Sequence, residues 1–178
     1  MSDFHQNGVI STLHNLSNRT LSEIENELKE HSKQLPIELI LPSLYSELSG
    51  PALKKIVSCL SEVKYLNHIT IGLDRANKSE FKKAKTFFSK LKQPHSVIWN
   101  DSPKMKKLDN DFKKLGIAPD QPGKGKNVWY CMGYTYSRNE AKAIALHDCD
   151  IITYTRELLA RLVYPVANPN FNYEFCKG

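Results

Sequence analysis

The chain has 178 residues, of which 40% are hydrophobic and 25% are charged. This length is within the size of one domain and long enough for a hydrophobic core, and the composition is ordinary for a globular protein. No apolar run approaches the length of a bilayer-spanning helix, and residues 1–14 lack the basic start and apolar core of a signal peptide. We therefore expect a cytoplasmic protein without a membrane partner.

The formal net charge of +6 raises the question of a nucleic-acid partner. The excess lysines lie mostly in residues 78–92 and 104–114, where they alternate with apolar residues at helical spacing. The solvated faces of amphipathic helices explain such segments, and no motif that reads nucleic acid accompanies them. We predict no nucleic-acid partner.

The four cysteines are scattered along the chain and show no Cys-x-x-Cys spacing. This pattern indicates neither a zinc site nor a disulfide framework. We therefore predict reduced thiols at Cys59, Cys131, Cys149 and Cys176.

Helical and strand-like patterns alternate along the sequence. Apolar residues at helical spacing predict helices over residues 17–34, 51–63, 78–91, 103–115 and 127–137. Short apolar runs predict strands over residues 37–41, 66–73 and 95–99, and a fourth strand that starts at Ala143 and ends at two aspartates.

This alternation indicates an α/β fold, with a mainly parallel sheet that has helices on both faces. The first strand is predicted to end at Pro42, because proline lacks the backbone N–H that a strand ladder uses. Residues 43–50 and 117–125 are predicted to be loops. We divide the chain into an N-terminal helical extension, residues 1–35, and one main domain, residues 36–178.

Asp148 and Asp150 form the most informative motif, because they follow a short apolar strand. Ligands bind at the carboxyl ends of strands in open α/β sheets, and two carboxylates there can supply oxygen ligands to a cation that carries phosphates. The alternative is that both aspartates cap a turn. His147 points the opposite way along the strand and is predicted to be packed or hydrogen-bonded rather than a metal ligand. Asp109 and Asp111 have the same spacing but lie among lysines, so we expect solvated surface there.

The loops that follow parallel strands open on one side of the sheet and should line one crevice. These loops are residues 42–47, 74–76, 99–101 and 148–150. Residues 123–127, with the sequence Gly-Lys-Gly-Lys-Asn, combine a permissive backbone, two cations and a helix start, which together can cradle a phosphate. A solvent-exposed turn is the alternative interpretation of this segment.

Four segments, taken in order, resemble the GT-A family of glycosyltransferases and most closely the glucosyl-3-phosphoglycerate synthase group. They are Leu39-Ile40-Leu41-Pro42-Ser43-Leu44-Tyr45-Ser46-Glu47, Gly72-Leu73-Asp74, Gly123-Lys124-Gly125-Lys126-Asn127-Val128-Trp129 and His147-Asp148-Cys149-Asp150. The resemblance covers about residues 36–178 and includes an Asp-x-Asp motif.

The resemblance implies a Rossmann-like GT-A fold that binds a nucleotide sugar, with Mg²⁺ or Mn²⁺ as the cofactor. It implies catalytic roles for Asp148 and Asp150, places Asp150 closest to the metal, and assigns acceptor binding to Lys177. The sequence departs from the group at Tyr45-Ser46-Glu47, where Asn-Glu-Glu is usual, and at Cys149, which replaces a common serine. The implied donor-binding residues are Pro42, Ser43, Leu44, Glu47, Asp74, Gly123, Lys124, Asp148, Cys149 and Asp150.

The implied function is a metal-dependent glycosyltransferase that moves a sugar from UDP-glucose or another NDP-glucose to a small phosphorylated acceptor such as 3-phosphoglycerate. In such a reaction a cation held by carboxylates stabilises the charge that grows on the leaving phosphate. Two alternatives remain open. One is an aspartyl-nucleophile phosphatase or phosphomutase, with Asp148 as nucleophile and Asp150 as acid/base. The other is a non-catalytic nucleotide-binding domain.

Residues 167–178 are predicted to be a loop that leads into a strand with Tyr173 and Phe175 on one face. In the group that the chain resembles, the acceptor site and a third metal ligand, usually a histidine, follow this strand. No histidine follows His147 in this sequence. We therefore expect a chain that ends within the fold, forms a homodimer by pairing its exposed edge with another copy, and transfers no sugar.

Overall fold

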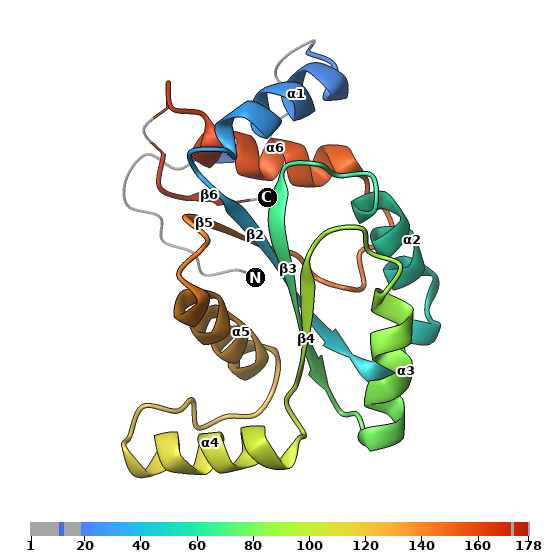
Figure 1. Cartoon of the computed structure of the whole chain (residues 1–178), viewed down its shortest axis with the longest axis vertical. Helices are drawn as coiled ribbons and strands as arrows, with labels where there is room; N and C mark the ends of the chain where they lie inside the picture. Colours follow the sequence, from blue (N-terminus) through green and yellow to red (C-terminus); the bar gives the residue numbers. More distant parts are fainter. Residues whose placement is uncertain (1–10, 13–18, 172, 178) are drawn as a thin grey trace.

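A computed structural model describes residues 11–12, 19–171 and 173–177. The main sheet has four parallel strands in the order β4-β3-β2-β5 (Figure 1). These strands are β2 (Ile37–Leu44), β3 (Leu66–Asp74), β4 (His95–Trp99) and β5 (Ala143–Leu146). A second, two-stranded parallel sheet pairs β1 (Ser11–Thr12) with β6 (Cys176–Lys177).

Helices cover both faces of the main sheet, which confirms the predicted fold class. Buried side chains of α1, α2, α3 and α6 join strand residues in one hydrophobic core, whereas α5 packs on β2 and β3 from the other side (Figure 1). The helices are α1 (Leu21–His31), α2 (Pro51–Leu60), α3 (Lys78–Phe88), α4 (Pro103–Lys114), α5 (Lys124–Arg138) and α6 (Arg156–Ala167), with a short 3-10 helix, η1 (Tyr45–Ser49).

Polar residues fix where four of these helices begin. The side chains of Thr20, Asn77, Ser102 and Thr155 each accept a hydrogen bond from a backbone N–H in the first turn of the helix that follows. Such N-caps satisfy donors that have no partner within the helix itself.

Pro42 does not end the first strand of the main sheet, and that prediction was wrong. β2 continues through Pro42 to Leu44, and Pro42 pairs with Gly72 of β3. On its other side, β2 pairs with β5 only as far as Ile40. Beyond Ile40 the strand therefore has an unpaired edge, and proline is tolerated where one side of a strand needs no ladder hydrogen bond.

Helix α6 lies where the sequence patterns predict no element. Its Leu159, Ala160 and Val163 lie in the hydrophobic core, and Pro165 sits near its C-terminal end. The Thr155 N-cap and this apolar spacing are signals that could have identified the helix. α5 also begins three residues earlier than predicted, at Lys124. Residues 17 and 18 of the first predicted helix lie outside the described residues.

The chain end differs from its prediction as well. Strand structure is confined to Cys176 and Lys177, whereas Tyr173 and Phe175 precede the strand, and Phe175 is exposed. The four cysteines are free thiols, as predicted. Among the helices that the structure describes, none has the length and apolar character required to cross a membrane.

Candidate functional site

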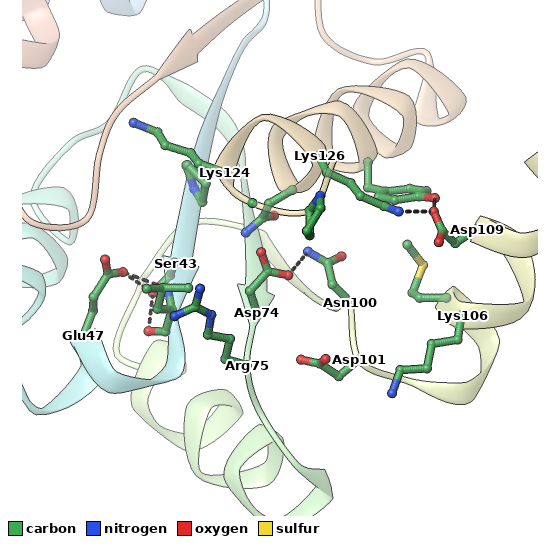
Figure 2. A pocket seen from close by; sticks show the side chains of 17 residues that line it. Ser43, Glu47, Asp74, Arg75, Asn100, Asp101, Lys106, Asp109, Lys124 and Lys126 are labelled. Atoms are coloured by element: carbon green, nitrogen blue, oxygen red, sulfur yellow. Dashed lines mark hydrogen bonds and ion pairs between the residues drawn. The ribbon is translucent and has the colours of Figure 1, made fainter. Parts of the chain in front are cut away.

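A cavity of about 510 Å³ opens where β2, β3 and β4 end and α5 begins (Figure 2). We call it the strand-end cavity. Its position agrees with the rule that open α/β sheets bind ligands at the carboxyl ends of their strands. The lining residues are Pro42, Ser43, Leu44, Glu47, Asp74, Arg75, Asn100, Asp101, Met105, Lys106, Asp109, Pro122, Gly123, Lys124, Lys126, Asn127 and Tyr130.

Glu47 folds back onto the end of β2. Its Oε2 accepts hydrogen bonds from the backbone N–H of Leu44, at 2.8 Å, and from the hydroxyl of Ser43, at 3.1 Å. The neighbouring Ser46 is exposed and is not among the lining residues. Within Tyr45-Ser46-Glu47, where the sequence departs from the group that it resembles, Glu47 is therefore the residue that lines the cavity. Its carboxylate fixes the backbone of Ser43 and Leu44.

Asp74, the last residue of β3, lies in the middle of the strand-end cavity (Figure 2). Its Oδ1 accepts a 2.8 Å hydrogen bond from the side-chain amide of Asn100 (Figure 2). Burial raises the pKa of Asp74 above its ordinary value, although the bond from Asn100 opposes that shift. Asn100 lies in a loop that is predicted to line the crevice, but its bond to Asp74 joins two strand ends 26 residues apart and has no signal in the sequence.

The backbone turns sharply after Asp74. Arg75 has a φ of 55°, in the left-handed region that residues other than glycine rarely adopt. Ala76 holds this bend in two ways, because its N–H donates to Asp101 at 3.0 Å and its carbonyl accepts from the indole of Trp99 at 2.7 Å. The bend brings Arg75 into the lining of the cavity.

The first turn of α5 supplies positive charge to the cavity. Gly123 precedes the helix with a φ of 130°, a conformation that favours glycine. Lys124 forms an ion pair with Asp148, and both side chains are about half exposed. The N–H groups of a first helical turn and the helix dipole favour an anion, so this end of α5 suits a phosphate.

Asp148, Cys149 and Asp150 follow β5 and do not belong to the described lining of the cavity. Asp148 nevertheless forms an ion pair with Lys124, which lines the cavity. Asp150 is exposed, whereas Cys149 is 2% exposed and burial raises the pKa of its thiol well above the ordinary value. His147 is buried, as predicted. Burial lowers its pKa to about 4, and its Nδ1 lies 3.1 Å from the hydroxyl of Tyr154.

Asp109 is not solvated surface, and that prediction was wrong. Its side chain is 17% exposed and binds the ammonium groups of Lys126, at 2.5 Å, and Lys113, at 2.9 Å. The hydroxyl of Tyr130 also donates to it at 2.5 Å. Lys126, its partner in α5, is 18% exposed. Asp111, on the outer side of α4, is 51% exposed, as predicted.

Lys177, the implied acceptor residue, lies on β6 outside the described lining of the cavity. Among the described residues, no group of three His, Cys, Asp or Glu side chains is arranged to hold a metal ion.

Two relatives match the chain along nearly its whole length. It is 49% identical over 178 residues to glucosyl-3-phosphoglycerate synthase of Persephonella marina. This match covers 100% of the present chain and 44% of that protein. It is 37% identical over 177 residues to the enzyme of the same name from Methanococcoides burtonii. This match covers 99% of the present chain and 43% of that protein. The chain thus spans less than half the length of these relatives. No protein-family model matches it.

Solved structures support the fold assignment. Glucosyl-3-phosphoglycerate synthase from Mycobacterium tuberculosis, in complex with Mn²⁺, uridine diphosphate and glucosyl-3-phosphoglycerate, matches with a TM-score of 0.56 and 15% identity. The match covers 90% of this chain and 48% of that one, and the same enzyme in complex with uridine diphosphate alone matches equally well. The resemblance to the glucosyl-3-phosphoglycerate synthase group, and with it the GT-A fold, is confirmed.

Proposed function

We propose that this chain, similar over its full length to glucosyl-3-phosphoglycerate synthases, is the donor-binding part of a metal-dependent glycosyltransferase that moves glucose from UDP-glucose to 3-phosphoglycerate. One observation carries the proposal. The residues that the resemblance assigns to donor binding, apart from Asp148, Cys149 and Asp150, all line one cavity, although they come from three distant segments. These residues are Pro42, Ser43, Leu44, Glu47, Asp74, Gly123 and Lys124.

The diphosphate of the donor binds at the first turn of α5 in this proposal. Lys124 supplies a mobile cation there, and the helix end supplies backbone N–H donors. The Lys124 side chain is half exposed and paired with Asp148, so its ammonium group can turn to a phosphate without a large loss of burial. A charge-assisted hydrogen bond of this kind is stronger than a neutral one.

Asp148 and Asp150 fit a divalent cation that is shared with the donor. Their side chains offer carboxylate oxygens, which Mg²⁺ and Mn²⁺ prefer. Asp148 is about half exposed and pairs with Lys124 of the cavity lining, and Asp150, two residues further along, is exposed. Mg²⁺ is usually held by one or two carboxylates together with substrate phosphates, which agrees with the lack of a three-residue cluster in the described part of the chain. A cation held there would supply Lewis-acid stabilisation to the leaving diphosphate.

The nucleoside of the donor, in this proposal, starts at the end of β2, lies over Asp74 and extends past the loop of Asn100 toward α4. Glu47 holds the backbone of Ser43 and Leu44 in place, so this wall is fixed before the ligand arrives. A wall that is already ordered loses less conformational entropy on binding, which strengthens the interaction. Cys149 lies behind this wall as a buried neutral thiol.

The acceptor is assigned from the relatives and from the solved structures. The relatives are named for 3-phosphoglycerate, and one solved complex contains phosphoglyceric acid alone. Lys177, on β6, remains our prediction for a contact with the acceptor phosphate.

Isothermal titration calorimetry with UDP, in the presence and absence of Mn²⁺, tests the proposal directly. We expect UDP to bind and Mn²⁺ to tighten the binding. A lack of UDP binding under both conditions would contradict it. Adding a generic phosphate ester in a separate assay distinguishes the phosphatase alternative, which predicts turnover of that ester without a nucleotide.

A further inference from the structure

Helix α4 is attached to the rest of the molecule mainly through polar contacts. The structure describes all of its residues, and none of them is buried. Figure 1 shows α4 at the periphery, beyond the start of α5 and away from the centre of the main sheet. The helix nevertheless contributes Met105, Lys106 and Asp109 to the lining of the strand-end cavity.

Asp109 is the centre of these contacts. We define the Asp109 cluster as Asp109 and Lys113 of α4 with Lys126 and Tyr130 of α5. One carboxylate accepts from all three partners, at 2.5 Å from Lys126, 2.5 Å from Tyr130 and 2.9 Å from Lys113. Partial burial of Asp109 opposes ionisation, yet the bonds from Lys126 and Tyr130 hold its pKa well below the ordinary value.

An aromatic contact also joins α4 to α5, about one helical turn beyond Asp109. There the rings of Phe112 and Trp129 meet edge to face, with centroids 5.7 Å apart. An aromatic pair of this geometry is favourable beyond the area that it buries. The Asp109 carboxylate is thus the point at which polar side chains of α5 hold α4.

The strand-end cavity has two distinct ends. Figure 2 shows Lys124 and Glu47 at one end and Lys106 and Asp109 at the other, with Asp74 and Asn100 between them. Lys124 pairs with Asp148, so the Asp-x-Asp motif adjoins the first end. In a donor whose diphosphate lies at Lys124 and whose base lies over Asp74, the nucleoside points toward α4.

We propose that Asp109 is a positioning residue that docks α4 as the wall closing the nucleoside end of the donor site. This inference rests on the proposed function, because it takes the donor orientation from it. Asp109 itself does not need to touch the ligand. It fixes Lys126 and Tyr130 in the cavity lining and sets the position of Met105 and Lys106 opposite them.

The proposal predicts a difference between two ligands. Pyrophosphate with Mn²⁺ occupies only the diphosphate end, whereas UDP with Mn²⁺ reaches both ends. If α4 is no longer held in place, the affinity for UDP should fall and the affinity for pyrophosphate should stay the same. A general loss of folding would instead weaken both ligands.

The test measures both affinities by calorimetry in Asp109→Asn and in the control Asp111→Asn, which changes a 51% exposed aspartate on the same helix. We expect Asp109→Asn to lower the affinity for UDP about tenfold, which corresponds to the loss of charge-assisted hydrogen bonds. The affinity for pyrophosphate should stay within about twofold of the wild-type value. Asp111→Asn should match the wild type for both ligands. Equal losses for UDP and pyrophosphate, or no loss for either, would overturn the inference.

Tyr130→Phe provides a second variant in case Asp109→Asn does not fold. It removes only the hydroxyl that donates to Asp109. We expect it to weaken UDP more than pyrophosphate, by a smaller factor, and the same loss for both ligands would again overturn the inference. Wild-type chain that fails to bind UDP contradicts the proposed function, whereas wild-type binding without the ligand difference contradicts the role of Asp109 alone.

Discussion

The side-chain amide of Asn127 donates a 2.9 Å hydrogen bond to the carbonyl oxygen of Gly72, and this buried contact fixes the first turns of α5 against β3. The approach is possible because residue 72 has no side chain. A Cβ at Gly72 would lie 1.7 Å from Oδ1 of Asn127 and 2.5 Å from the sulfur of Cys131. The start of α5, which carries Lys124, can therefore lie this close to β3 only because residue 72 is glycine.

We predict that Gly72→Ala lowers the free energy of unfolding by about 1 to 3 kcal/mol, the usual cost of overpacking a filled core. Gly133→Ala is the matched control, because a Cβ at this helical position meets nothing within 4 Å. Alanine is favoured over glycine inside a helix, so the control should keep or raise stability. Urea unfolding of the three proteins checks this, and wild-type stability in Gly72→Ala would refute the packing argument.

Lys124→Ala should separate binding from stability. The ion pair with Asp148 is half exposed, and such pairs contribute about 0 to 1 kcal/mol to folding. The loss of a charge-assisted hydrogen bond should weaken UDP by about 1.5 to 3 kcal/mol. Lys92→Ala, which breaks an exposed pair with Glu62 in another part of the surface, should not change UDP affinity. Equal UDP affinities in both variants would show that Lys124 does not meet the diphosphate.

Asp150→Ala should abolish the tightening of UDP binding by Mn²⁺, because a diphosphate shared between Lys124 and a cation needs a carboxylate on the other side of that cation. Calorimetry with and without Mn²⁺ measures the effect. Asp111→Ala is the suitable control, since Asp109 binds Lys126 and lines the strand-end cavity. An unchanged Mn²⁺ effect in Asp150→Ala would remove Asp150 from the metal site.

His68 should make the fold sensitive to acid. Burial lowers its pKa below the ordinary value of 6.5, and Arg138 beside it acts in the same direction, while Glu38 and Glu140 oppose the shift. As the pH falls below about 6.5, the unfolded chain takes up a proton at His68 more readily than the folded chain. The contribution of His68 to stability is therefore present above that pH and is lost on acidification.

His68→Gln tests this expectation, because glutamine does not titrate and can still hydrogen-bond to Ser96, which lies 3.1 Å from Nε2 of the histidine. Urea unfolding at about pH 7.5 and about pH 5.5 should show a smaller loss of stability in the variant than in the wild type. If both proteins lose the same amount, His68 is not the titrating group.

The alternation of strands and helices was determined by the sequence itself. Apolar spacing is a local property, and it placed β2, β3, β4 and α2 to α5 close to their observed positions. Parallel strands bring the loops after them to one edge, so the meeting of Ser43, Asp74 and Asn100 around one cavity also followed from order along the chain. The fourth predicted loop, residues 148–150, is not part of the described lining.

The tertiary structure alone decided the features that depend on neighbours distant in the sequence. Pro42 lies inside β2 because the pairing with β5 stops at Ile40, which no local pattern reveals. Asp109 and Asp111 look alike in sequence, yet only Asp109 faces α5 and meets Lys126. The environment of a charged side chain is set by which helix packs against it, and this packing follows from the whole fold rather than from the spacing of the motif.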